Sequence, residues 1–330
     1  MMAQSATKSR SNRLNLYRIK ELGVLVTALA AFGIVAAIEP RFLQPGNIRS
    51  VLLYVPLIVI VAMGEMMVII TRNIDLSLGS ILAFSGIAVG MLFIRYADFP
   101  VIPAFLLGTL IGGGLGFFNG FLISKLKIPA IIVTLGTLNA YRGLLFIVSG
   151  GRQIDPNYIP EDLISLSQTS FIGIPAIIIF AALIALAAHL FMKYSHIGRE
   201  IYAMGSNRKG AELRGINTAR IVLVVYTIAG ACAGFAGIVY ASRFGYVNPG
   251  ITGVGFEFIV IAATVIGGTS ISGGTGSVLG VVIGCLLLGI VNTALAVLGV
   301  SAFWQQAMYG FIILLALILD KVVQNKSAQA

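Results

Sequence analysis

A succession of long apolar segments, separated by short polar ones, constrains this chain more than any other feature. Most segments approach the roughly 20 residues that a helix needs to cross the hydrocarbon core of a bilayer. They lie at residues 22–38, 51–70, 78–94, 101–123, 129–148, 173–192, 221–241, 256–267, 277–298 and 303–319. The sequence therefore predicts an all-α, polytopic membrane protein with about ten transmembrane helices.

The composition excludes other classes of protein. Apolar residues make up 58% of the 330 residues, charged residues 10%, and the mean hydropathy is +0.98. A soluble domain carries about a quarter charged residues, so a water-soluble enzyme and a disordered protein are both excluded. The net charge of +10 would indicate a nucleic-acid partner only if the basic residues shared one water-soluble face.

The basic residues instead follow the membrane topology. With a cytoplasmic N-terminus, most of the 22 Lys and Arg residues fall in inside loops, as the positive-inside rule requires. The exceptions are Arg41, Arg49, Arg95, Arg152 and Arg243 in outside loops and Arg142 at membrane depth. We therefore expect a multi-pass protein with both termini cytoplasmic, in contact with membrane lipid and not with nucleic acid.

The chain divides into one large domain and two tails. We expect residues 1–20 to form a basic cytoplasmic tail, residues 21–320 a single transmembrane domain, and residues 321–330 a second cytoplasmic tail. The first apolar run leads into Glu39-Pro40 and not into a small-residue cleavage site, so we interpret it as an uncleaved helix. The inside loop at residues 193–220 is the longest basic connection.

A weak internal repeat relates the two halves of the domain. Leu107, Gly108, Ile111, Gly112 and Leu115 recur 172 residues later as Leu279, Gly280, Ile283, Gly284 and Leu287, and Asn119 and Asn292 follow within one position of this offset. The first copy would run from outside to inside and the second from inside to outside. The repeat therefore predicts inverted units of five helices, an arrangement used by transporters.

No catalytic or metal-binding pattern is present. His189 and His196 have no carboxylate or cysteine at ligand spacing, and Cys232 and Cys285 lie singly in apolar runs. No glycine-rich phosphate loop lies between a strand and a helix. We therefore expect a chain that is not an enzyme, binds no cofactor or metal of its own and does not hydrolyse ATP.

The segment at residues 71–80 interrupts two apolar runs with too few residues for a full loop. We expect a broken or re-entrant turn whose freed backbone groups are satisfied by neighbouring side chains. Asp75 has two possible roles here. It can cap the next helix through the amides of Ser77 and Leu78, or it can act in a gate or permeation path.

Other polar residues are expected at membrane depth, where an ionisable group is costly and usually faces protein or water. Arg142 could pair with Glu65 or with Glu257, which would offset both desolvation costs. The candidates for a translocation path or gate are Asn73, Asp75, Ser77, Asn119, Thr134, Thr137, Asn139, Tyr141, Arg142, Glu65, Glu257 and Asn292. The uncharged members could equally serve as interhelical hydrogen-bond partners.

The inside loop at residues 193–220 carries the signal of a short helix. Ser206 or Asn207 can cap its start, Lys209 to Arg214 continue it, and Gly215 suits the left-handed residue that ends a helix. The alternative is an ordinary positively charged loop.

Several motifs together resemble the permease subunits of ribose-type ABC sugar importers. They are Asn73-Ile74-Asp75-Leu76-Ser77-Leu78-Gly79-Ser80, Lys127-Ile128-Pro129-Ala130, Thr134-Leu135-Gly136-Thr137, Tyr202-Ala203-Met204-Gly205-Ser206-Asn207, Gly215-Ile216-Asn217, and Ile261-Ala262-Ala263 followed by Gly267-Gly268-Thr269-Ser270. Their order extends the resemblance over about residues 22–320. Within the family, the sequence is most similar to permeases for rhamnose, autoinducer-2 and ribose uptake.

The resemblance implies a type II importer fold and a set of partners. They are cytoplasmic ATP-binding subunits that carry ATP and Mg, a second permease subunit that is identical or a sister chain, and a periplasmic sugar-binding protein. The chain itself is then expected in the bacterial inner membrane. The resemblance also implies an ATPase-coupling helix, transferred here to Ser206, Asn207, Gly210, Ala211, Glu212, Leu213, Arg214 and Gly215. The implied function is import of a monosaccharide or sugar-like solute.

Two departures leave the solute open. Asn73, preceded by Arg72, stands where many relatives have glycine, and Ile259 stands where many have an acidic residue. The alternative function is an ion-coupled secondary transporter of a small polar solute, in which Asp75, Glu65 and Glu257 would bind the ion.

Overall fold

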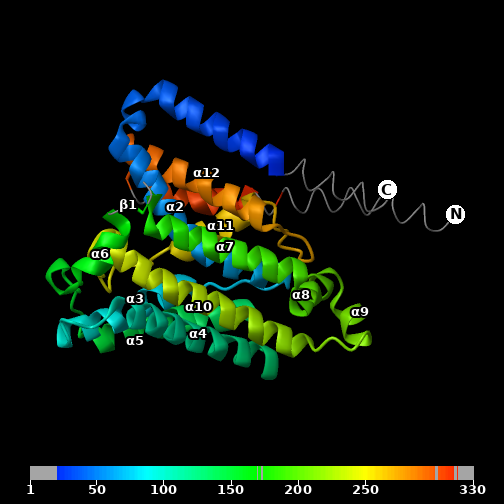
Figure 1. The fold of residues 1–330 in the computed structure, drawn as a ribbon. Coiled ribbons are helices and arrows are strands. Elements are labelled where there is room, and N and C mark those ends of the chain that lie inside the picture. Colours follow the sequence, from blue (N-terminus) through cyan, green and yellow to red (C-terminus); the bar gives the residue numbers. More distant parts are fainter. Residues whose placement is uncertain (1–20, 169, 172–173, 302–303, 316–317, 319–330) are drawn as a thin grey trace.

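The computed structural model describes residues 21–168, 170–171, 174–301, 304–315 and 318 (Figure 1). These residues form a bundle of helices. The only strands among them are β1 (Ser170–Phe171) and β2 (Ile174–Pro175), a short antiparallel hairpin that places Phe171 opposite Ile174. The prediction of an all-α membrane protein is confirmed. The two predicted tails lie outside the described residues.

Eight helices in the described part of the chain are long and apolar enough to cross a membrane. They are an N-terminal helix (Glu21–Ile38), α2 (Pro45–Ile70), α3 (Leu78–Arg95), α4 (Val101–Lys125), α5 (Ala130–Ser149), α7 (Ala176–Tyr194), α10 (Thr218–Phe244) and α12 (Val278–Val297). The shorter elements are η1 (Pro40–Leu43), η2 (Pro156–Tyr158), α6 (Glu161–Gln168), α8 (His196–Ser206), α9 (Arg208–Leu213) and α11 (Phe256–Ile266). Each of these eight helices corresponds to one of the apolar segments in the sequence.

The segment predicted at residues 256–267 differs from the others. Helix α11 has 11 residues, which rise about 16 Å at 1.5 Å per residue, roughly half of a hydrocarbon core. It therefore cannot cross a bilayer by itself. The segment predicted at residues 303–319 is helical over residues 304–315, and part of it lies outside the described residues.

Helix α2 forms the centre of the bundle. It contacts α7, α10, α11 and α12, and nearly all of its residues from Val51 onward are buried. Its apolar surface would suit lipid as well as other helices, but its buried Glu65 favours the interior of the bundle. The N-terminal helix lies at the edge of the bundle beside α12, where Ala28 packs against Ile283 and Leu287 (Figure 1).

The contact between α4 and α10 is the most extensive one between two helices of the described chain. Glycines allow these two helices to approach closely. A Cβ atom added to Gly112 would lie 2.2 Å from the carbonyl oxygen of Gly230 and 2.6 Å from the Cα atom of Gly234. Helix association in a membrane depends on such packing between small residues because lipid is as apolar as the side chains it would replace.

The packing also follows the pattern that the predicted inverted repeat requires. A repeat of five helices relates α4 to α12 and α10 to α2, and both α4–α10 and α12–α2 are contacting pairs. The matched glycines, by contrast, contact elements that the repeat does not relate to each other. Gly112 on α4 meets α10, whereas Gly284 on α12 meets the carbonyl oxygen of Ala263 on α11. The repeat is thus supported at the level of helix pairs.

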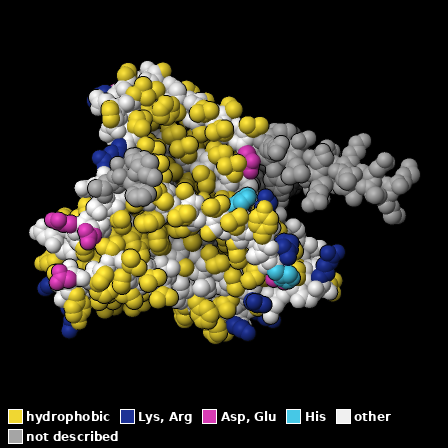
Figure 2. Space-filling model, viewed as in Figure 1, with side chains coloured by type: hydrophobic (Ala, Val, Ile, Leu, Met, Phe, Trp, Pro, Cys, Tyr) yellow, Lys and Arg dark blue, Asp and Glu magenta, His cyan; other side chains and the backbone are white. Residues whose placement is uncertain are grey.

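The surface in Figure 2 is apolar along the length of the bundle. Acidic side chains gather at the end that carries α6, which begins with Glu161 and Asp162, and basic side chains gather mainly at the end that carries α8 and α9. The start of the N-terminal helix lies at this second end because the hydroxyl of Ser277 at the start of α12 donates to Glu21 (2.5 Å). The protein is therefore a multi-pass membrane protein with chemically distinct ends.

Substitution of Gly112 tests the α4–α10 contact. The Gly112→Ala variant should lower the free energy of unfolding by about 1–3 kcal/mol, because the added methyl group overlaps the backbone of α10. The matched control is Gly114→Ala on the same helix, where the new methyl group meets nothing within 4 Å. Denaturation of both variants in detergent measures the difference, and equal stability would contradict the proposed contact.

Candidate functional site

The segment between α2 and α3, residues 71–77, folds back along α2. The backbone amide of Asp75 donates to Oε1 of Glu65 (3.3 Å), which lies five residues before the end of α2. At 1.5 Å per residue, the segment returns by about 7 Å into the bundle. Glu65, Asp75 and Ser77 are fully buried. The predicted re-entrant turn is therefore present.

A chain of hydrogen bonds starts from this turn. Oδ1 of Asp75 accepts from the amide (2.9 Å) and the hydroxyl (2.6 Å) of Ser77. The side-chain amide of Asn119 on α4 donates to the Ser77 hydroxyl (2.8 Å), and the hydroxyl of Tyr141 on α5 lies 2.9 Å from Oδ1 of Asn119. Glu65, Asp75, Ser77, Asn119 and Tyr141 are called here the buried polar cluster. It joins four segments of the chain that sequence reasoning listed as separate candidates.

Neighbouring side chains also satisfy the backbone of the turn. The carbonyl oxygen of Ile74 accepts from the hydroxyl of Tyr226 on α10 (3.2 Å) and from the hydroxyl of Thr134 on α5 (3.3 Å). Sequence reasoning missed Tyr226. The available signal was a tyrosine in the middle of an apolar run, since the hydroxyl of a buried tyrosine usually requires a partner.

The two roles weighed for Asp75 are both compatible with this geometry. Asp75 binds the amide of Ser77, the residue before α3, but its bonds do not extend to the amide of Leu78. The second carboxylate oxygens, Oδ2 of Asp75 and Oε2 of Glu65, are buried and have no hydrogen-bond partner in the described part of the chain. These oxygens are acceptors that the resting structure leaves free.

The predicted ion pair of Arg142 does not form. Neither Glu65 nor Glu257 makes a salt bridge with Arg142 among the described residues. The guanidinium instead donates to the carbonyl oxygen of Thr252 (2.7 Å) and lies 3.4 Å from that of Pro249. Backbone oxygens in the turn before α11 thus replace the carboxylate partner. Glu257 contacts the start of α3, where a Cβ atom on Gly79 would lie 2.3 Å from its Oε2 atom.

The remaining path candidates lie apart from the cluster or at its edge. Asn139 is exposed and bonds to a carbonyl of its own helix, and Asn292 bonds to Tyr309 (2.8 Å). Asn73 bonds within the turn to Thr71 (2.9 Å), and Thr137 is buried beside Thr134. Asn292 therefore serves as a hydrogen-bond partner between helices in this structure.

The loop at residues 193–220 forms two short helices, of which sequence reasoning found one. Ser195 caps α8 by accepting from the amide of Gly198 (2.8 Å), and Asn207 caps α9 by accepting from the amide of Gly210 (2.9 Å). Gly215 follows α9 with φ 81°, which is the left-handed conformation expected of it. Ser206 is the last residue of α8 and not the cap of α9. The short helix predicted in this loop is therefore present.

Glu212 braces α9 against the start of α10. Its carboxylate accepts from the hydroxyl of Thr218 (2.9 Å) and pairs with Arg208 (3.3 Å). These two bonds hold the pKa of Glu212 below its ordinary value, and the bond from Thr218 has the larger effect. The brace is therefore present above the ordinary glutamate pKa and is lost only as the pH falls through the lowered one. Next to it, the side chain of Leu213 is 89% exposed.

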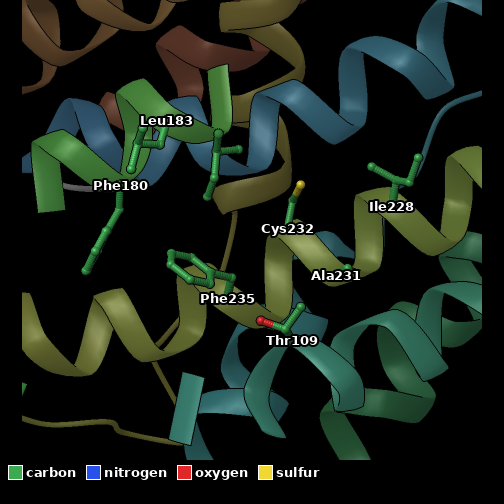
Figure 3. Close-up of a pocket in the computed structure, with 8 residues that line it drawn as sticks. Thr109, Phe180, Leu183, Ile228, Ala231, Cys232 and Phe235 are labelled. Atoms are coloured by element: carbon green, nitrogen blue, oxygen red, sulfur yellow. The ribbon is translucent and has the colours of Figure 1, made fainter. Parts of the chain in front are cut away.

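A separate hollow of about 410 Å³ lies between α4, α7 and α10 (Figure 3). Its walls are apolar except for Thr109, whose hydroxyl bonds to the carbonyl of Phe105 in its own helix (2.7 Å). None of the predicted site residues lines it. The residues around it are Thr109, Phe180, Leu183, Ile184, Ile228, Ala231, Cys232 and Phe235. The hollow suits hydrocarbon and not a hydroxyl-rich solute.

The bundle, the re-entrant polar turn and the two capped helices at one end define a membrane transport protein. Residues 47–317 match the family described as the permease component of the branched-chain amino acid transport system. The chain belongs to this family of ABC importer permeases.

Curated relatives match over nearly the whole chain. The autoinducer 2 import system permease protein of Photorhabdus laumondii is 36% identical over 91% of this chain and 89% of its own length. The autoinducer 2 import system permease protein of Yersinia enterocolitica is 37% identical over 91% of this chain and 82% of its own length. The D-allose transport system permease protein of Escherichia coli K12 is 36% identical over 92% of this chain and 91% of its own length. No solved structure matches the chain. The chain is thus a permease subunit of the sugar-importer type.

Substitution of Asn119 tests the buried polar cluster. The Asn119→Ala variant should lose about 1–3 kcal/mol of unfolding free energy, because the buried hydroxyls of Ser77 and Tyr141 lose their common partner. Asn139→Ala is the matched control, since the side chain of Asn139 is exposed and bonds only within its own helix. Denaturation in detergent compares the two variants. A smaller loss for Asn119→Ala than for Asn139→Ala would contradict the cluster.

Proposed function

We propose that this chain is the transmembrane subunit of a bacterial inner-membrane importer that carries a monosaccharide or a sugar-like signal. Separate cytoplasmic ATP-binding subunits, which hold ATP and Mg, drive transport, and a periplasmic binding protein delivers the solute. A second permease subunit, identical or a sister chain, completes the pathway. Both termini are cytoplasmic, and this chain does not itself hydrolyse ATP.

The observation that carries the proposal is the α8–α9 unit with its exposed leucine. A short helix that is capped by Asn207 and braced by Glu212 is rigid enough to transmit a rigid-body push. Leu213 of α9 is 89% exposed at the polar end of the protein, and we propose it as the apolar anchor of a partner contact. We assign α9 as the docking point of an ATP-binding subunit.

A groove of about 350 Å³ continues this surface. It lies between α8 and the residues that follow α9, and it is lined in part by Arg199 and Arg214. Two guanidinium groups favour a partner segment with acidic or carbonyl groups. The docking surface would thus combine an apolar anchor, Leu213, with a polar groove in which Glu200 accompanies the two arginines.

The nature of the solute is supported by two observations. Relatives that import autoinducer 2 and D-allose match almost the whole chain. In addition, the buried polar cluster contains acceptor oxygens on Glu65 and Asp75 without partners, and hydroxyl groups are donors that fit such acceptors. We propose that the turn at residues 71–77 opens toward the pathway during alternating access and contacts the solute only weakly.

Substitution of Leu213 tests the docking assignment. In the Leu213→Asp variant, the amount of ATP-binding subunit that co-purifies should fall about tenfold, which corresponds to loss of one buried apolar anchor and burial of a charge. Ile251→Asp is the control. Ile251 is 59% exposed in the turn before α11, at the other end of the bundle, so this variant should retain the subunit.

Quantitative co-purification from membranes measures both variants beside the unaltered chain. Retention of the ATP-binding subunit by Leu213→Asp at the control level would contradict docking at α9. Absence of any ATP-binding subunit from the unaltered chain would contradict the proposed function as a whole.

A further inference from the structure

Arg72 joins the re-entrant turn to the α8–α9 unit. Its Nε–H donates to the carbonyl oxygen of Gly205 (2.6 Å), and its Nη2 group donates to that of Ser206 (2.9 Å). Gly205 and Ser206 are the last two residues of α8, and Asn207, the cap of α9, follows directly. The guanidinium thus holds the hinge between the two short helices. It also satisfies carbonyl groups that a helix end leaves without partners, in the region of its negative dipole.

The backbone at Arg72 is held in an uncommon conformation. Its φ angle is 65°, and among the described residues only Lys127 is another non-glycine residue with positive φ. A non-glycine side chain in the left-handed region usually costs about 1 kcal/mol or more. Asparagine, aspartate and glycine adopt this region more readily, yet arginine stands here. The residue is therefore placed by its side-chain contacts and not by its backbone preference.

Close backbone packing surrounds these bonds. A Cβ atom on Gly205 would lie 1.9 Å from the carbonyl oxygen of Ile70, the last residue of α2. The amide of Gly274 donates to this same oxygen (2.9 Å), and the hydroxyl of Tyr202 on α8 donates to the carbonyl of Gly276 (2.9 Å). The end of α8 therefore cannot move without displacing either the end of α2 or the turn before α12.

Only two residues separate Arg72 from Asp75 in the buried polar cluster. An extended chain rises at most about 3.3–3.6 Å per residue, so three steps span about 10 Å. Asp75 is anchored to Glu65 and Ser77 by hydrogen bonds. A displacement of the α8–α9 hinge is therefore applied directly to the polar turn, with little slack between them.

We propose that Arg72 is the positioning residue that couples movement of the α8–α9 unit to the turn at residues 71–77. This inference rests on the proposed function and adds the route by which a push at α9 reaches the buried polar cluster. Arginine is suited to it because the planar guanidinium fork addresses two adjacent carbonyl groups at once, which the single ammonium group of lysine does less well. No carboxylate in the described chain forms an ion pair with Arg72, so its charge serves the end of α8.

The test uses the assembled importer with its ATP-binding subunits and binding protein in liposomes, and compares solute uptake with ATP hydrolysis. The Arg72→Gln variant should assemble and hydrolyse ATP, but its uptake per ATP should fall about tenfold, as expected for loss of one charge-assisted hydrogen bond. The uptake per ATP of the Arg72→Lys variant should lie between that of the unaltered complex and that of Arg72→Gln. A purely structural role would lower uptake and hydrolysis together and leave their ratio unchanged.

Arg49 provides a matched control. Its Nη2 group bonds to the carbonyl oxygen of Gln168 (3.1 Å) at the end of α6, so it makes a similar helix-end contact at the opposite end of the bundle. The Arg49→Gln variant should keep the ratio of uptake to hydrolysis. An unchanged ratio in Arg72→Gln, or an equal loss in Arg49→Gln, would overturn the proposal.

A reversible cross-link covers the case in which Arg72→Gln fails to assemble. In the double variant Arg72→Cys, Ser206→Cys, the two thiols can be joined by a cross-linker about as long as an arginine side chain. The cross-linked complex should have a higher ratio of uptake to hydrolysis than the same complex before linking, and no gain on linking would overturn the proposal. If the unaltered complex shows no solute-dependent ATP hydrolysis, the proposed function fails independently of Arg72.

Discussion

The need to satisfy backbone groups inside a membrane protein governs this structure. A helix satisfies its own backbone, but the turn at residues 71–77 leaves α2 and returns into the bundle, where no lipid group can bond to it. The protein meets this need from three helices, through Glu65 on α2, Thr134 on α5 and Tyr226 on α10. Asn119 on α4 also binds the turn, through the hydroxyl of Ser77. The turn therefore fixes the relative positions of the helices around it, and any movement of the turn changes their packing.

Glycine contacts and the Arg72 contact extend this constraint in two directions. Within the membrane, Gly112 allows α4 to meet α10 at backbone distance, which brings Asn119 within reach of the turn. Toward the polar end, Arg72 binds the last residues of α8. The buried polar cluster and the α8–α9 unit are thus parts of one connected assembly. In such an arrangement a small shift at one end is transmitted through packed elements and not absorbed by a loop.

Much of this could be predicted from the sequence, because hydrophobic length and capping are local signals. The apolar runs located the eight long helices, and Asn207 and Gly215 located α9. The contacts could not be predicted, since partner choice depends on how the helices pack. Arg142 therefore binds the carbonyl of Thr252 and not a glutamate, and Asn292 binds Tyr309 and not the cluster. The contact of Arg72 with the end of α8 could not be predicted either, because no local sequence pattern indicates an arginine in the left-handed backbone conformation.

The most direct test of the account is the energy source for solute uptake by the purified complex in liposomes. The account predicts that uptake requires ATP and the binding protein, and that it continues when an uncoupler collapses ion gradients while ATP is maintained. Uptake by this chain without an ATP-binding subunit, driven by an ion gradient and abolished by the uncoupler, would contradict it. In that case Asp75, Glu65 and Glu257 would bind the coupling ion.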